Sequence, residues 1–189
     1  SAGIGSTNAN GSDFSFSEQV KQNWNNSLGL TLSIPIFDKR QTKSSINKAK
    51  LQKDLGLKVD PDIPLIAMVG RLSNQKGLDL VQCVMDELCS DDLQLVVLGT
   101  GEERYENMFR HYDWKYHDRV SANIYYSEPM AHKIYAACDA FLMPSLFEPC
   151  GLSQLMSLRY GTLPIVRETG GLKDTVEPYN EFEGTGTGF

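Results

Sequence analysis

Two cations lie in one short loop between a predicted strand and a predicted helix. Arg71 and Lys76 belong to the segment GRLSNQKG, which follows a continuous apolar run. An arginine offers a planar fork of donors to phosphate oxygens, and a lysine offers a mobile point charge. The pattern indicates an anion site at the end of a strand, and spacing alone leaves a solvated basic loop as the alternative.

An acid just before a predicted helix could do a different kind of chemistry. Glu148 opens the segment EPCGLSQ, and a carboxylate in a cleft can accept hydrogen bonds from sugar hydroxyls. Gly151 allows the backbone to approach a ligand closely. The amides near Leu152 and Ser153 would begin a helix, whose N-terminus favours a phosphate by ~0.3–1 kcal/mol. The alternative is that Glu148 complements the dipole of its own helix.

Three further segments end predicted strands and could line the same site. Tyr125 and Tyr126 end the third predicted strand, and the residues alone indicate ordinary core or rim aromatics. Residues 99–101 (GTG) do not form a dinucleotide fingerprint, and a plain strand-to-helix turn explains them. The last turn consists of Arg167, Thr169, Gly170 and Gly171. Asp174 and Thr175 follow it, and we expect them to cap or brace the next helix.

Hydrophobic patterning places these residues on alternating strands and helices. Continuous apolar runs predict strands buried on both faces, and apolar spacing of three to four predicts helices. The predicted strands cover 64–70, 93–98, 123–126, 140–143 and 163–166. The predicted helices cover 78–88, 102–115, 129–138, 152–160 and 171–176. This order predicts an α/β fold with a doubly wound, Rossmann-like parallel sheet, which we expect to be truncated at its C-terminal side.

The composition limits the classes of function. The 189 residues are 41% hydrophobic and 22% charged, so a packed core is expected. The net charge of -6 and the pI of about 5.1 argue against nucleic-acid binding and against adhesion to an anionic membrane. We find no apolar run long enough for a membrane-spanning helix and no secretory signal. Because the sequence starts at Ser1, we expect a processed product or a fragment.

The four cysteines are Cys83, Cys89, Cys138 and Cys150. No two are spaced as CxxC and no histidines stand at metal-ligand spacing, so we expect no metal site. Cys83, Cys89 and Cys138 fall in apolar patterns and are predicted to be small core residues. Cys150 has no nearby histidine in the sequence to activate it, so we expect backbone contacts from it rather than nucleophilic chemistry. This cysteine usage suits a reducing compartment.

The first 47 residues differ from the rest, and we do not expect them to form an independent domain. Residues 1–26 are rich in Ser, Asn and Gly, and residues 27–37 alternate apolar with small or polar side chains, which predicts a strand. A basic stretch compatible with a helix follows, from Lys39 to about Leu55. The alternation fits either a soluble two-stranded hairpin or a lipid-facing barrel strand.

The segment 15–50, SFSEQVKQNWNNSLGLTLSIPIFDKRQTKSSINKAK, resembles the strand-to-helix passage of TolC-type outer-membrane efflux channels. One hairpin's worth of such a channel cannot close a barrel, so no pore can form from it alone. We expect the seam with the following domain near residues 47–57, and the hypothesis is a fusion, an assembly artefact or a recombined reading frame. Membrane association would follow only if the segment is a genuine channel strand.

Residues 48–189 resemble the donor-binding half of the bacterial glycogen (starch) synthases. The resemblance is carried by residues 144–174, PSLFEPCGLSQLMSLRYGTLPIVRETGGLKD, and by the R-x-x-x-x-K spacing of Arg71 and Lys76. These enzymes are retaining glycosyltransferases of the GT-B class, which transfer glucose from ADP-glucose to the non-reducing end of an α-1,4-glucan. The resemblance implies that residues 48–189 are the nucleotide-sugar-binding C-terminal domain of such an enzyme, incomplete at its end.

The resemblance also implies roles for single residues. Arg71 and Lys76 would stabilise the departing diphosphate, Glu148 would orient the glucose, and Tyr126 would pack on the adenine. The other donor contacts would come from Ser145, Cys150, Gly151, Leu152, Ser153, Thr169 and Gly170. Met156 stands where many retaining transferases carry a second acid, which fits the bacterial branch and removes a paired-carboxylate mechanism. Neither a metal nor a cofactor is implied beside the substrate ADP-glucose and the product ADP.

The resemblance further implies a missing partner, the N-terminal acceptor domain of the GT-B enzymes. Both halves must close on the substrates, so we expect the isolated chain to bind ADP without elongating an α-glucan. We expect the transferase part in the cytoplasm. Two other classes stay open: a fragment of an outer-membrane efflux channel fused to a non-catalytic nucleotide-binding module, and a non-catalytic nucleotide-binding or structural module by itself.

Overall fold

The structure is a computed structural model that describes residues 38–189, with side chains described from residue 43. The strand predicted for residues 27–37, and with it the resemblance to an efflux-channel strand, lies outside the described residues. Helix α2 (Asp38–Asp54) confirms the helix that we predicted after that strand.

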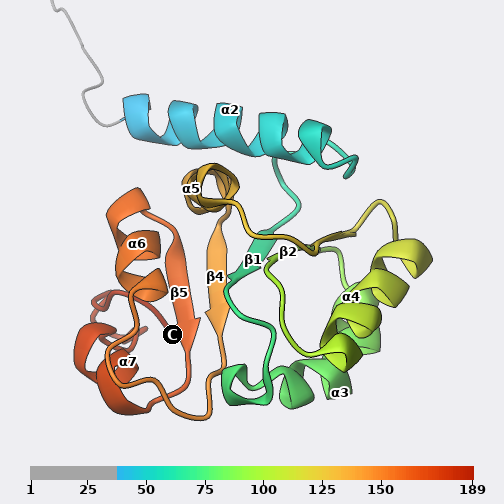
Figure 1. Ribbon diagram of the computed structural model, residues 1–189. Helices are drawn as coiled ribbons and strands as arrows, with labels where there is room; N and C mark the ends of the chain where they lie inside the picture. Colours follow the sequence, from blue (N-terminus) through green and yellow to red (C-terminus); the bar gives the residue numbers. More distant parts are fainter. Residues whose placement is uncertain (1–37) are drawn as a thin grey trace, which may run out of the picture. The chain divides into compact units, whose positions relative to one another are not determined.

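Strands and helices alternate from residue 65 onward (Figure 1). The strands are β1 (Leu65–Val69), β2 (Gln94–Leu98), β3 (Val120–Asn123), β4 (Ala140–Met143) and β5 (Leu163–Val166). The helices are η1 (Asn74–Lys76), α3 (Leu78–Ser90), α4 (Glu103–Lys115), α5 (Glu128–Ala137), α6 (Ser153–Tyr160) and α7 (Gly170–Thr175). The predicted α/β alternation is therefore confirmed.

The five strands form one parallel sheet in the order β3-β2-β1-β4-β5. The chain moves outward from β1 to β3 and then crosses back through α5 to place β4 on the other side of β1. This reversal makes the space beyond the ends of β1 and β4 a topological switch point, the usual ligand crevice of such sheets. Paired strands also end level with each other, since Val69 partners Leu98 and Leu98 partners Asn123.

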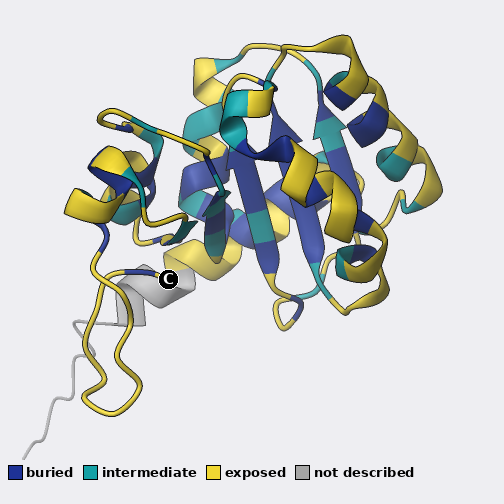
Figure 2. Ribbon diagram, turned by 90° about the horizontal axis from the view of Figure 1, so that it is seen from below, coloured by how far each residue is buried: buried dark blue, intermediate teal, exposed yellow. Residues whose placement is uncertain are grey.

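Side chains of the sheet alternate between two separate cores. On one face, Ala67 and Phe141 join a buried cluster with residues of α2 and α5. On the other face, Met68 and Val97 join a buried cluster with residues of α3 and α4. Figure 2 shows the buried sheet between helices whose outer sides are exposed. Because both faces are covered, the strands read as continuous apolar runs, which is why they could be predicted.

Buried polar contacts fasten α2 to the sheet at the edge opposite the strand ends. Lys48 Nζ lies 2.6 Å from Asp139 Oδ2, and the same oxygen accepts the Leu65 amide at 2.7 Å. Gln52 is fully buried and donates to Gln94 Oε1 at 2.8 Å. Among the helices that the structure describes, none is long and apolar enough to cross a membrane.

The structure corrects two of our predictions. Cys83 is exposed, because the buried stripe of α3 runs through Leu78, Val81, Met85 and Cys89, and position 83 points away from that stripe. Strand β3 ends at Asn123, so Tyr125 and Tyr126 lie in the following loop instead of ending a strand. The burial predicted for Cys89 and Cys138 is confirmed.

Candidate functional site

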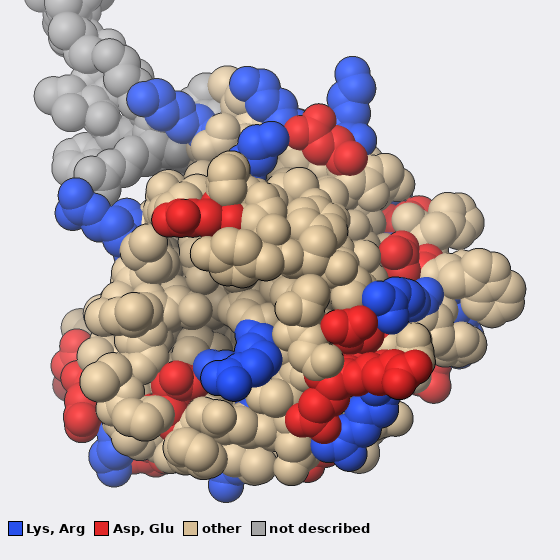
Figure 3. Space-filling view, viewed as in Figure 1, with Lys and Arg blue, Asp and Glu red and all other residues tan. Residues whose placement is uncertain are grey.

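The strand order arranges the candidate residues in a line along one edge of the sheet. The loop after β3 stands at one end, followed by the loops after β2, β1, β4 and β5. Tyr126 therefore belongs to one end, Arg71 and Lys76 to the middle, and Glu148 to the other end. The space-filling view shows a basic group near the middle of the face, beside a hollow (Figure 3).

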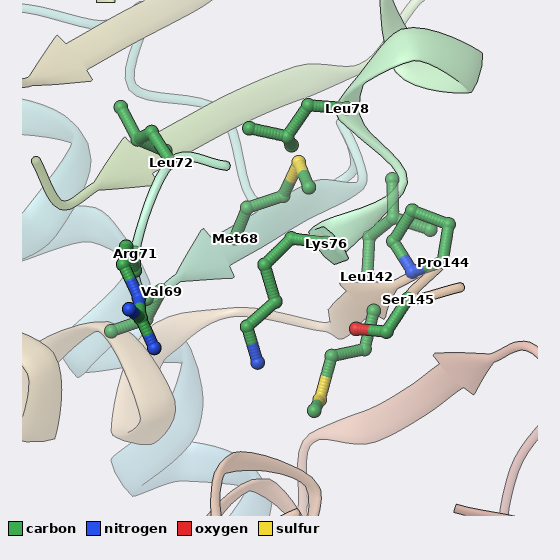
Figure 4. Close-up of a pocket in the computed structure, with 11 residues that line it drawn as sticks. Met68, Val69, Arg71, Leu72, Lys76, Leu78, Leu142, Pro144 and Ser145 are labelled. Carbon is green, nitrogen blue, oxygen red and sulfur yellow. The ribbon is translucent and has the colours of Figure 1, made fainter. Parts of the chain in front are cut away.

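The two cations point into the same space from different parts of the β1 loop (Figure 4). Arg71 follows β1 directly and is exposed, and its guanidinium makes no ion pair within residues 43–189. Lys76 ends η1, and its Nζ lies 2.5 Å from Glu148 Oε2. Both side chains line a small pocket with Ser145, so the middle of the edge holds a free guanidinium beside a paired ammonium.

Backbone contacts hold the β1 loop against both neighbouring loops. The Leu72 amide donates to Thr100 O at 2.9 Å in the β2 loop. On the other side, Gly77 has φ 69°, and a Cβ atom there would lie 2.0 Å from Pro144 O in the β4 loop. Only glycine can give this close approach without moving the backbone. Lys76 is thereby placed next to the β4 loop.

Glu148 contacts two side chains, Lys76 and Ser145, through the same carboxylate oxygen. Its side chain is 14% exposed, and Oε2 accepts from Lys76 and, at 3.4 Å, from the buried Ser145 hydroxyl. Helix α6 begins only at Ser153 and has no acid in its first turn. The alternative that Glu148 complements its own helix dipole is therefore wrong. The carboxylate lies in the loop before α6 and pairs with Lys76.

The loops after β4 and β5 form a single packed unit. The Gly171 amide donates to Glu148 O at 2.9 Å, and a Cβ atom at Gly170 would lie 2.4 Å from the same oxygen. Gln154 is fully buried and donates to Cys150 O at 3.0 Å and to Thr175 Oγ1 at 3.1 Å. The turn at Thr169 and Gly170 thus sits directly against the Glu148 loop.

The predicted brace of α7 is confirmed for one of its two residues. Thr175 Oγ1 donates to Gly171 O at 2.6 Å and accepts from Gln154, which joins α7 to α6. Asp174 is exposed, and the residue at the N-cap of α7 is Thr169. At α6, no side chain caps the first amides, so those near Leu152 and Ser153 keep their donor capacity.

An open pocket of about 580 Å³ occupies the other end of the edge. Its wall consists of residues 69–71 after β1, residues 98–101 after β2, residues 125–128 after β3, and Ala131 of α5. Tyr126 is 86% exposed and Tyr125 43% exposed, so both rings are available to a ligand. Arg71 lines this pocket as well as the small pocket beside Lys76, and so connects the two ends.

Sequence reasoning missed two parts of this pocket. We treated residues 99–101 as a plain turn, and we gave Glu128 no role, yet both line the pocket. The Gly101 amide donates to Glu106 Oε1 at 2.9 Å, which lowers the pKa of Glu106 and fixes the β2 loop. The usable signal was position: each segment follows the end of a parallel strand, and all such ends meet at one edge.

The structure brings some predicted site residues together and keeps others apart. Lys76, Ser145 and Glu148 are in contact, and the turn at Gly170 packs on the Glu148 loop. Tyr126 lies with the β2 and β3 loops, across Arg71 from Glu148. Within the described residues, no three His, Cys, Asp or Glu side chains form a group that could hold a metal ion.

Comparison with protein families gives one match, over residues 48–189, to the glycosyl transferases group 1. A glycogen synthase of Lachnospira eligens is 80% identical over 143 residues, which are 76% of this chain and 30% of that protein. A glycogen synthase of Clostridium acetobutylicum is 60% identical over the same shares. The chain thus spans about a third of the length of these relatives.

Two solved structures show the same fold. The catalytic domain of starch synthase IV from Arabidopsis thaliana, bound to ADP and acarbose, has a TM-score of 0.67 and 38% identity. This match covers 73% of this chain and 29% of that one. Anabaena Alr3699/HepE in complex with UDP-glucose has a TM-score of 0.56 and 20% identity, over 70% of this chain and 36% of that one. The second likeness supports the fold alone.

Proposed function

We propose, from the premise that this chain belongs to the glycosyl transferases group 1 family, that residues 48–189 form the donor-binding half of a glycogen synthase. The donor is ADP-glucose, and the glucose goes to the non-reducing end of an α-1,4-glucan with retention of configuration. The observation that carries the proposal is the order of groups along the sheet edge. An exposed aromatic pocket, two cations and a carboxylate follow one another as nucleoside, diphosphate and sugar do in the donor.

The two cations stabilise the diphosphate as it leaves. Negative charge builds on the phosphate oxygens when the bond to glucose breaks, and donors already in place lower the energy of that transition state. Arg71 makes no ion pair within residues 43–189, so its guanidinium can bind phosphate oxygens, and Lys76 can turn from Glu148 toward a phosphate oxygen. The amides near Leu152 and Ser153 receive the distal phosphate at the start of α6.

The sugar lies at the end of the edge formed by the β4 and β5 loops. Glu148 accepts hydrogen bonds from glucose hydroxyls and so orients the ring. Ser145, Cys150, Thr169 and Gly170 surround this position through backbone and small side chains. At the opposite end, Tyr126 packs against the adenine with its exposed ring.

The acceptor side of the reaction requires a second domain. Because this chain spans about 30% of the length of the relatives it matches, we propose that the acceptor site lies in the part of those proteins that it does not cover. Closure of two domains positions the acceptor and excludes water. The chain alone should therefore bind ADP and transfer no glucose.

Two measurements on the purified chain test this proposal. Calorimetric titration with ADP should show binding, and incubation with ADP-glucose and maltooligosaccharide should give no longer oligosaccharides. A folded chain that does not bind ADP would remove the donor-site assignment. Glucose transfer by the chain alone would show that the acceptor site is already present.

We also propose that residues 1–47 come from an efflux-channel-like sequence joined to a cytoplasmic transferase. The support is the resemblance of residues 15–50 to the TolC-type passage, together with a family match that starts at residue 48. Sequencing of the source DNA across codons 40 to 60 tests the junction. An uninterrupted native gene would exclude an assembly artefact.

A further inference from the structure

The residues that line the large pocket include one with a positive and one with a negative side chain. Arg71 comes from the β1 loop and Glu128 from the first residue of α5, and the other ten wall residues are uncharged. Strand β2 lies between β1 and β3, so the β2 loop separates the Arg71 loop from the loop that leads to Glu128. A carboxylate repels a diphosphate electrostatically, but it accepts hydrogen bonds well from neutral donor groups.

The Glu128 carboxylate does not cap its own helix, so its acceptor capacity is not taken by the backbone of α5. Ser127 is the N-cap of α5, and its hydroxyl accepts the Met130 amide at 3.2 Å. The Glu128 side chain is 73% exposed, and within residues 43–189 the basic group nearest to it is His132 Nε2, 3.9 Å from Oε1. That separation is longer than a hydrogen bond, so the carboxylate keeps its acceptor capacity for a ligand.

A line of side chains reaches Glu128 from the far end of α6. Tyr160, the last residue of α6, places its hydroxyl 3.0 Å from His132 Nδ1, and its ring stacks on Tyr135 with centroids 6.3 Å apart. When the phenol donates to Nδ1, the proton of the neutral imidazole stays on Nε2, the nitrogen that faces Glu128. His132 is then oriented by Tyr160, with its Nε2 on the side of the carboxylate at 3.9 Å from Oε1.

We propose that Glu128 selects the nucleoside of the donor by accepting hydrogen bonds from its neutral N–H or O–H groups, and that His132 and Tyr160 position this carboxylate. The inference rests on the proposed function, because it concerns the same nucleotide. Two parts of ADP offer such donors, the ribose diol and the exocyclic amine of adenine. Both are absent from inorganic pyrophosphate, which the cations alone can bind.

Calorimetry on the full chain separates these terms with four ligands: ADP, 2′-deoxy-ADP, inosine diphosphate and pyrophosphate. Glu128→Gln should weaken ADP about tenfold, or ~1.4 kcal/mol, and should not weaken pyrophosphate. The matched control is Glu103→Gln, which removes an exposed acid from the same first position of α4. If Glu128 binds the ribose, 2′-deoxy-ADP should bind the wild-type chain and the Glu128→Gln variant equally well. If Glu128 binds the amine of adenine, inosine diphosphate should bind the two proteins equally well.

The outcomes distinguish this inference from the proposed function. Wild-type chain that binds ADP, with a Glu128→Gln variant that binds it equally well, would overturn the inference alone. Equal weakening of ADP and pyrophosphate would overturn it too, because the effect would then not depend on the nucleoside. A folded wild-type chain without ADP binding would remove both. Because the Glu128 side chain is exposed, its substitution should leave the chain folded. The thermal unfolding of the variant checks this.

The positioning role of His132 has its own readout. His132→Ala should weaken ADP about threefold and leave pyrophosphate unchanged, and Tyr160→Phe should act in the same direction by a smaller factor. Added to Glu128→Gln, neither substitution should weaken ADP further, since the carboxylate that they position is gone. Additive losses in the double variants would show that His132 and Tyr160 act independently of Glu128.

Discussion

The two ends of the site, which we propose hold the nucleoside and the sugar, differ in how far their side chains are already engaged with one another. The nucleoside end is an open pocket of about 580 Å³ with an exposed Tyr126 at its wall. At the sugar end, side chains of the protein satisfy one another: Lys76 pairs with Glu148, and Gln154 is buried against the loop that carries Glu148. One end offers space, and the other offers partners that are already engaged.

This difference predicts how each end responds to a ligand. A preformed pocket binds without first breaking contacts of its own, so its affinity reports the groups that line it. At the sugar end, a ligand must replace contacts that already exist, above all the pair between Lys76 and Glu148. Substitutions at the two ends should therefore change binding in opposite directions in at least one case.

The largest effect should come from removing the two cations that connect the ends. Arg71→Ala/Lys76→Ala should weaken ADP by at least about 100-fold, because a hydrogen bond to a charged group contributes ~1.5–3 kcal/mol. Calorimetric titration measures it. The control Lys53→Ala/Lys58→Ala makes the same charge change away from the strand ends and should bind as the wild type does. Equal binding by all three proteins would contradict the phosphate site.

The next effect concerns the contact between the β1 loop and the β4 loop, where Gly77 packs against Pro144. Gly77 and Gly56 have φ 69° and 71°, so an alanine pays a similar backbone cost of ~1 kcal/mol at either position. Only at Gly77 would the new Cβ atom meet a backbone oxygen, Pro144 O at 2.0 Å, whereas Gly56 has no atom within 4 Å.

Gly77→Ala should therefore lower the free energy of unfolding by ~1–3 kcal/mol more than Gly56→Ala does. Urea titration followed by circular dichroism measures both. Gly77→Ala should also weaken ADP, because the loop that carries Lys76 must move. Equal destabilisation by the two substitutions would show that the contact between Gly77 and the β4 loop can relax to make room for a methyl group.

A smaller effect of opposite sign should follow from breaking the engaged pair. Glu148→Gln removes the charge that holds Lys76, so ADP should bind about threefold more tightly, within the range expected for an exchanged ion pair. The same variant should lose most of any preference for ADP-glucose over ADP. Glu168→Gln, which breaks an exposed pair with Lys173, is the control. Weaker ADP binding by Glu148→Gln would mean that Glu148 orients Lys76 for the phosphate instead of competing with the phosphate for it.

The two ends also differed in how far the sequence predicted them. At the sugar end, strands β4 and β5 were predicted at their observed bounds, because short apolar runs in a covered parallel sheet leave little choice. The residue pattern and the resemblance both singled out Lys76 and Glu148, and the structure shows a contact between them that we did not predict. Spacing alone could not have paired them, since they are far apart in the chain.

At the nucleoside end, the prediction shifted β3 by three residues at each boundary. The real strand contains Ser121 and Asn123, which are buried and bonded to each other, so its polar residues hid it. The run from Ile124 to Tyr126 has strand-forming residues, but the partner strand β2 ends at Leu98 and offers nothing to pair with them. Glu128 was missed for a different reason, because most residues that share the pocket wall with it come from the β1 and β2 loops, which are distant in the sequence.

The smallest effect tests the comparison without changing ADP affinity. Cys83 and Cys150 are exposed, whereas burial raises the pKa values of Cys89 and Cys138 and so lowers their thiolate fractions. Iodoacetamide at pH 8, read by mass spectrometry, should therefore modify Cys83 and Cys150 first. In the proposed arrangement ADP fills only the nucleoside and phosphate positions, so it should slow the modification of Cys150 only slightly, and ADP-glucose should slow it more, with Cys83 as the internal control. Equal protection of Cys150 by both ligands would place the sugar away from the β4 loop.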